Sequence, residues 1–137
     1  MATPKPRLSH IGIPVTDLSK SIAFYKKWAG MTAQDGPADP GGVKGARMTQ
    51  TAGDFAISLL EMPVSNALPM PGVMHLGLDC TSRAQVDKIA SDAKKAGILL
   101  SGPVDSGPGL GYQTYISDPD GNNLEFSFGQ QLGATDG

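Results

Sequence analysis

The chain has 137 residues, of which 39% are hydrophobic, so it is long enough to bury the core of one compact domain. Its 11 Lys and Arg residues against 13 Asp and Glu give a net charge of −2 and form no basic run, which excludes an electrostatic site for nucleic acid or an anionic membrane. No apolar stretch is long enough to span a bilayer, and no secretory signal is recognisable. A single cysteine, Cys80, allows no internal disulfide, and we expect a cytoplasmic protein.

An internal repeat organises the sequence. Residues 8–13, LSHIGI, resemble residues 73–78, VMHLGL, and the histidine and the glycine have the same spacing in both copies. Each run alternates as a half-buried strand should. Each is followed by a helix-start signal, at residues 16–17 and 81–82.

Two amphipathic helices are predicted after these signals, over residues 18–29 and 83–96. The residues expected on their apolar faces are Ile22, Tyr25, Trp28 and Ala29 in the first and Val86, Ile89, Ala90 and Ala93 in the second. Gly30 and Gly97 stand where a left-handed C-cap is expected. The repeat therefore extends from the first strand to the end of the helix.

Each half continues with a Gly-Pro pair, at residues 36–37 and 102–103, which is expected to open a loop. Two strand-like runs then close each half, at residues 46–51 and 55–60 and at residues 112–117 and 123–128. The predicted fold class is α+β, with a single domain over residues 1–137 made of two tandem βαβββ modules. Their bounds are about 7–62 and 73–128, with a linker at about 63–72 and a flexible C-terminal tail at 129–137.

Three side chains are candidate metal ligands. His10 and His75 occupy equivalent positions of the repeat, so a two-fold arrangement can bring them to one point. Glu125 lies between Leu124 and Phe126, where a carboxylate needs a partner. Two histidines and one carboxylate suit Fe(II), Mn, Ni or Zn. A histidine on a strand usually has a structural role when it is considered alone, and it is the equivalence of the two positions that favours a metal site.

The runs SHIGIPVTDL (residues 9–18) and SIAFY (21–25) resemble the first module of the vicinal oxygen chelate superfamily, and DPDGNNLE (118–125) resembles the end of its second module. This superfamily includes glyoxalase I, fosfomycin-resistance transferases, extradiol dioxygenases and bleomycin-binding proteins. The resemblance covers about residues 7–128. It implies a glyoxalase-like fold in which the modules form an open eight-stranded cup around one divalent metal ion.

By this resemblance, the ligands of that ion are His10, His75 and Glu125. The fourth ligand position departs from the glyoxalase pattern, because Ser58 stands where glyoxalase I and the epimerases have Glu or Gln. Glu61 is the alternative ligand, although strand alternation turns it to the opposite face unless a bulge intervenes. With Ser58 in that position, Glu125 would have to act as both ligand and base.

Two other branches of the superfamily use the same three ligands. Fosfomycin transferases have a tyrosine placed much as Tyr115 is, but residues 98–137 contain no Lys or Arg to bind a phosphonate. Extradiol dioxygenases have the pattern Tyr-x-x-Asp-Pro-x-Gly-x-x-x-Glu, which residues 115–125 match. Those enzymes also use a catalytic histidine, whereas both histidines of this chain are assigned to the metal.

The sequence therefore predicts a metal-dependent enzyme of glyoxalase or dioxygenase type that chelates two neighbouring oxygens of a small substrate. Its expected catalytic residues are Glu125 and Tyr115, the latter as a proton donor or orienting hydroxyl. Its expected substrate contacts are Ser58, Tyr112 and Gln113, with Gln113 and Tyr115 on one strand face and Tyr112 on the other. The alternative is a metal-free drug- or metabolite-binding protein of the bleomycin-resistance type.

The resemblance also predicts a homodimer. In many members of the superfamily the cup is formed by one module from each of two subunits. On that model, His10 comes from one chain and His75 and Glu125 come from the other. A small molecule and a second copy of the chain are the expected partners, with no nucleic acid and no membrane.

Overall fold

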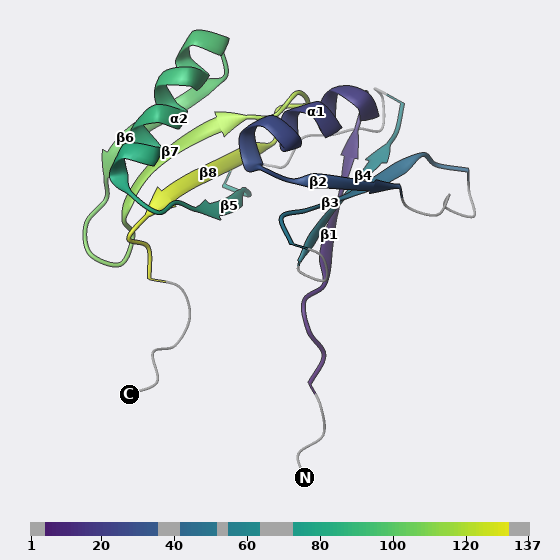
Figure 1. Ribbon diagram of the computed structural model, residues 1–137, viewed down its shortest axis with the longest axis horizontal. Coiled ribbons are helices and arrows are strands. Elements are labelled where there is room, and N and C mark those ends of the chain that lie inside the picture. Colours follow the sequence, from purple (N-terminus) through teal and green to yellow (C-terminus); the bar gives the residue numbers. More distant parts are fainter. Residues whose placement is uncertain (1–4, 36–41, 52–54, 64–72, 132–137) are drawn as a thin grey trace. The chain divides into compact units, whose positions relative to one another are not determined.

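The computed structural model describes residues 5–35, 42–51, 55–63 and 73–131 (Figure 1). The chain divides into two compact units, Met1–Leu68 and Pro69–Gly137, here called the first and second modules. Within the described ranges, each module contains one helix and four strands in the order β-α-β-β-β, which confirms the predicted α+β fold class and the tandem repeat. In this part of the chain no helix is long and apolar enough to cross a membrane.

The first module is a four-stranded sheet covered by one helix. Its elements are β1 (His10–Val15), α1 (Leu18–Ala29), β2 (Thr32–Asp35), β3 (Gly45–Thr49) and β4 (Ala56–Glu61). The strand order is β1-β4-β3-β2, in which β1 runs parallel to β4 and the other neighbours are antiparallel.

The second module repeats this topology. Its elements are β5 (Leu76–Asp79), α2 (Arg83–Ala96), β6 (Leu99–Asp105), β7 (Tyr112–Ser117) and β8 (Asn123–Phe128). The strand order is β5-β8-β7-β6, again with one parallel pair, β5 and β8. The repeat in the sequence is thus a repeat of strand pairing.

The helices begin and end at the residues that the sequence predicts. The side chain of Asp17 accepts a hydrogen bond from the Lys20 backbone N–H at 3.1 Å. Ser82 does the same for a backbone N–H of α2. Gly30 and Gly97 end the helices with φ of 62° and 76°, a left-handed conformation that glycine adopts at little cost.

Each helix packs on one face of its own sheet (Figure 1). The core of each module lies between its helix and its sheet. In the second module, Val86, Ala90 and Ala93 are buried as predicted, whereas Ile89 is only half-buried. In α1 the buried stripe is rotated from the expected one: Ser21 and Phe24 are buried beside Tyr25 and Ala29, while Ile22 and Trp28 are only half-buried. Ser21 lies one turn before Tyr25 on the same face of the helix. Its small side chain allows that face to pack against the sheet.

The second Gly-Pro pair does not open a loop. Residues 102–103 lie inside β6, where the register with β7 shifts between Ser101 and Val104. β6 is the edge strand of its sheet and has a neighbouring strand on one side only. Proline, which has no N–H to donate to a second strand, is therefore tolerated there. The first Gly-Pro pair, residues 64–72 of the predicted linker and residues 132–137 of the predicted tail lie outside the described residues.

Candidate functional site

The open face of the second sheet contains the candidate site. Leu124 and Phe126 of β8 are buried in the core, so strand alternation turns Glu125 to the face opposite α2. The register of β7 and β8 places Tyr115 directly across from Glu125. In the outer pair of strands, Ser101 of β6 lies across from Tyr115. These side chains therefore form one polar row across the sheet.

His75 precedes β5 and faces this row. Its Nδ1 lies 2.9 Å from the backbone carbonyl oxygen of Val73, and since a carbonyl only accepts, Nδ1 holds the hydrogen. The other ring nitrogen, Nε2, lies 3.5 Å from Oε2 of Glu125. The imidazole ring also packs edge-to-face against Tyr115, with centroids 5.6 Å apart.

Glu125 is the buried member of the group, with 3% of its surface exposed. Its Oε2 accepts a hydrogen bond from the Tyr115 hydroxyl, and its Oε1 accepts one from Nε2 of Gln130 at 3.0 Å. Burial first, and then the bond to the carboxylate, raises the pKa of Tyr115 to about 12. Both carboxylate oxygens thus have donors, as a buried carboxylate requires.

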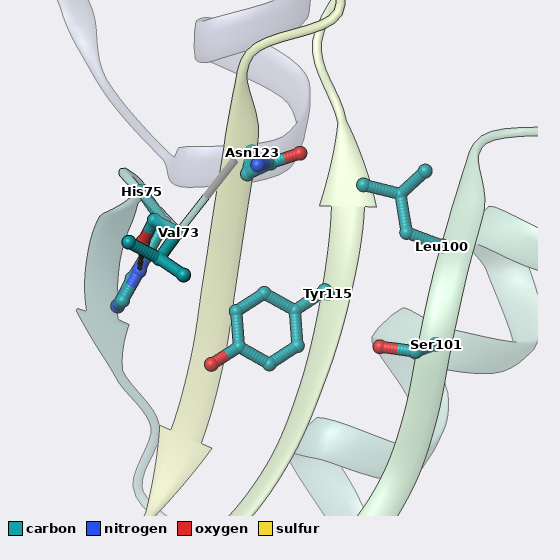
Figure 2. A pocket seen from close by; sticks show the side chains of 6 residues that line it. All are labelled: Val73, His75, Leu100, Ser101, Tyr115 and Asn123. Atoms are coloured by element: carbon teal, nitrogen blue, oxygen red, sulfur yellow. Dashed lines mark hydrogen bonds between the residues drawn. The ribbon is translucent and has the colours of Figure 1, made fainter. Parts of the chain in front are cut away.

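A pocket of about 410 Å³ opens beside these residues. It is lined by Val73, His75, Leu100, Ser101, Tyr115 and Asn123. Figure 2 shows the Tyr115 ring in the middle, with His75 on one side and Leu100 and Ser101 on the other. A cavity of this size, with apolar walls and a few polar groups, suits a small molecule.

The first module has a serine where the second has its buried carboxylate. Gly12 of β1 pairs with Ser58 of β4, and at the equivalent position Gly77 of β5 pairs with Glu125 of β8. The predicted equivalence of Ser58 and Glu125 is therefore confirmed by strand register.

Glu61 lies on the other face of that sheet. The pairing of β1 with β4 is unbroken from His10 to Val15, so no bulge turns Glu61 round. Its Oε2 instead accepts a hydrogen bond from the backbone N–H of Leu18 at 2.9 Å, at the N-terminus of α1. A carboxylate there stabilises the helix because it accepts a hydrogen bond from a free N–H of the first turn and because its negative charge interacts favourably with the helix dipole.

One residue that lies directly across from Ser58 in the first sheet was not predicted from the sequence. Arg47 of β3 pairs with Ser58, as Tyr115 pairs with Glu125. Arg47 is exposed, and its neighbour on β2 is Gln34. The 67-residue offset between Ser58 and Glu125 aligns Tyr115 with Met48, so the sequence repeat does not identify Arg47 and strand register does. The chain thus has a cation at a position equivalent to Tyr115, although residues 98–137 have none.

The remaining predicted contacts divide between the faces of the second sheet. Gln113 shares the face of Tyr115, and its Oε1 is buried with no hydrogen-bond partner in the described part of the chain. Tyr112 lies on the α2 side, where its hydroxyl donates to Asp87 and its ring lies 4.7 Å from the Arg83 guanidinium carbon. The structure therefore does not bring Tyr112 to Glu125.

The donors of the second module fit a divalent metal ion in chemistry but are incomplete in number. An imidazole Nε2 and a carboxylate oxygen, from His75 and Glu125, face each other at 3.5 Å. Among the described residues, no group of three His, Cys, Asp or Glu side chains could hold a metal ion. His10 lies in the first module, where its Nδ1 is 2.8 Å from the Ser9 hydroxyl.

Comparison with known proteins agrees with this architecture. The model of the Glyoxalase/Bleomycin resistance protein/Dioxygenase superfamily matches residues 7–126. An uncharacterized protein of Pseudomonas aeruginosa is 35% identical over 133 residues, which cover 93% of this chain and 92% of the relative. A probable trivalent organoarsenical cleaving enzyme of Bacillus subtilis is 29% identical over 128 residues, covering 87% and 77%.

A solved structure shares the fold. It is a mutant of the fosfomycin resistance protein FosX of Listeria monocytogenes, in complex with Mn(II) and 1S,2S-dihydroxypropylphosphonic acid. The TM-score is 0.73 at 21% identity, and the match covers 93% of this chain and 95% of that one.

Proposed function

The chain belongs to the Glyoxalase/Bleomycin resistance protein/Dioxygenase superfamily, and on that premise we propose that it is a divalent-metal-dependent enzyme that chelates two neighbouring oxygens of a small substrate. The observation that supports this most is the convergence of His75, Tyr115 and Glu125 on the open sheet face, beside a pocket of about 410 Å³. The proposed ligands of the metal are His75, Glu125 and His10.

The energetics of this face favour a functional role over a structural one. Burying a carboxylate is costly even when it is hydrogen-bonded, and an apolar residue would stabilise a sheet face better. The first module has the same topology with Ser58 at the equivalent position, so the fold does not require a carboxylate there. Glu125 is therefore better explained by chemistry than by folding.

The residues have distinct proposed roles. His75 presents Nε2 because its Nδ1–H is bound to the Val73 carbonyl. Tyr115 lines the pocket, and its single O–H donates to Glu125. On this proposal that O–H turns to negative charge that develops on a substrate oxygen once Glu125 binds the metal. A divalent ion bound there would polarise the substrate oxygens as a Lewis acid.

Proton transfer falls to Glu125 on this proposal. Ser58 cannot act as a carboxylate base, and Glu61 faces α1. Glu125 is thus proposed both to bind the metal and to accept a proton from the substrate. This set of residues is compatible with isomerisation, whereas ring-cleaving oxygenation lacks the catalytic histidine that extradiol dioxygenases use, because both histidines of the chain are proposed metal ligands.

Metal content tests the proposal directly. Protein purified without chelator, and protein reconstituted with Fe(II), Mn, Ni or Zn, is expected to hold about one ion per chain by elemental analysis. His75→Ala and Glu125→Gln should lose that ion, whereas the control Glu61→Gln, on the opposite face, should keep it. If no ion binds the wild-type protein under any of these conditions, the enzyme proposal fails and a metal-free ligand-binding role takes its place.

The proposed subunit arrangement has its own test. If His10 of one chain completes the site of another, mixing His10→Ala with Glu125→Gln protein produces heterodimers with one intact site and one doubly altered site. Metal binding should then reappear in the mixture. If all three ligands come from one chain, mixing restores nothing, and a monomer with a full site would also contradict the arrangement.

A further inference from the structure

Gln130 connects two buried residues of the open face. Its Nε2 donates to Oε1 of Glu125 at 3.0 Å, and its Oε1 accepts from the Ser127 hydroxyl at 3.3 Å. Ser127 and Glu125 are 1% and 3% exposed. Because a carboxylate only accepts hydrogen bonds, the NH₂ group of Gln130 must be the one that faces Glu125. The orientation of the amide is therefore set by its partners.

The backbone around Gln130 is fixed by the glycine-rich loop before β7. The Gln131 N–H donates to the Gly109 carbonyl at 3.1 Å. At Gly111, which has φ of 81°, a Cβ atom would lie 2.6 Å from the Phe128 carbonyl oxygen, so only glycine allows the segment to approach so closely. Residues 129–131, expected in a flexible tail, are thus bonded to the second module.

We propose that Gln130 is a positioning residue that sets the orientation of the Glu125 carboxylate. With Oε1 of Glu125 bound to Gln130, Oε2 is the oxygen that faces His75 and Tyr115. This inference rests on the proposed function, because an oriented carboxylate matters most as a ligand. Partners of this kind hold ligating carboxylates in many metal sites.

The chain supplies a matched control for this test. Gln131 is the next residue and is exposed, and its bond to Gly109 uses the backbone N–H, which Gln131→Ala retains. Gln130→Ala removes the donor to Glu125 and leaves the backbone of the segment unchanged. The two variants therefore differ in the side-chain hydrogen bonds of Gln130, which are the one to Glu125 that the inference concerns and the one from Ser127.

The first readout is the dissociation constant of Mn(II), measured from the signal of free Mn(II) by electron paramagnetic resonance. Gln130→Ala is expected to weaken binding about 10- to 100-fold, with Gln131→Ala unchanged. The visible spectrum of the Co(II)-loaded protein should change in the first variant only. Equal effects in both variants would indicate a merely structural segment and would overturn the inference.

The second readout needs no metal. Crystal structures of the metal-free wild-type and Gln130→Ala proteins should differ in the Glu125 carboxylate, which is expected to rotate away from its wild-type position. An unmoved carboxylate would overturn the inference. If the wild-type protein binds no metal at all, the proposed function fails, and this comparison still decides whether Gln130 orients Glu125.

Discussion

Tyr115 donates a hydrogen bond to the carboxylate of Glu125 from directly across the β7–β8 ladder. The equivalent pair in the first module is Arg47 and Ser58, which has no carboxylate. The two modules share one topology but have different functional groups at these equivalent positions. The Tyr115–Glu125 pair is accordingly where experiments on this protein should begin.

The first prediction concerns the ionisation of Tyr115 in the metal-free protein. Burial and the bond to Glu125 raise its pKa to about 12, whereas a free tyrosine ionises near 10. The difference in absorbance at 295 nm between wild type and Tyr115→Phe should therefore titrate near pH 12. A difference titrating near pH 10 would contradict the buried, bonded phenol.

The same shift affects stability at high pH. Because the pKa of Tyr115 is raised on folding, its contribution is complete below about pH 10 and is lost as the pH rises through about 12. Urea denaturation at pH 9 and at pH 11.5 should show a larger loss of unfolding free energy for wild type than for Tyr115→Phe. Equal losses in the two proteins would show that the phenol does not contribute.

The second prediction concerns the turn between β7 and β8. Asp118 is buried and accepts hydrogen bonds from the backbone N–H groups of Asp120 and Asn122, at 2.9 and 2.7 Å, and from the Asn122 side chain at 3.0 Å. Asp118→Ala should lower the free energy of unfolding by about 2–4 kcal/mol, because these donors lose a charged acceptor. Urea denaturation measures the change.

Asp118→Asn is the matched variant for that measurement. It keeps one acceptor oxygen, so its loss of unfolding free energy should be smaller than that of Asp118→Ala. Indistinguishable stabilities of wild type and Asp118→Ala would contradict a structural role. A clear loss of stability in Asp118→Ala would show that Asp118 is needed for the turn. The turn would then account for this aspartate, which also fits the dioxygenase pattern.

The third prediction separates the two faces of the first sheet. Glu61→Ala should cost about 1 kcal/mol of unfolding free energy, because the Leu18 N–H at the start of α1 loses its acceptor. Its metal content should match wild type. Ser58→Ala, on the opposite face, is the control and should not reproduce the destabilisation. Loss of metal in Glu61→Ala would show that this carboxylate is a ligand after all.

The fourth prediction concerns the single cysteine. Burial, with a smaller contribution from Asp79, raises the pKa of the Cys80 thiol, so little thiolate is present at pH 8. Iodoacetamide should alkylate Cys80 slowly in the folded protein and rapidly in urea, as measured by mass spectrometry. Equal rates in the two conditions would contradict the buried environment.

Much of this molecule follows from local patterns. The caps at Asp17 and Gly30, the bounds of both helices and the equivalence of Ser58 with Glu125 depend on spacing within short segments and on strand alternation. Those patterns are complete in the sequence, so they can be interpreted without a structure. The opposite orientation of Glu61 follows in the same way, because one unbroken strand period decides it.

The tertiary structure decided what depends on contacts between segments. The bond from Gln130 to Glu125 requires the chain to turn at Gly129, and the pairing of Arg47 with Ser58 requires strand register. The buried position of Phe24 depends on how α1 is rotated on its sheet. Sequence by itself determined the modules, their helix ends and the candidate ligands. Which side chains hold Glu125 in place was decided only by folding, since such contacts have no local period.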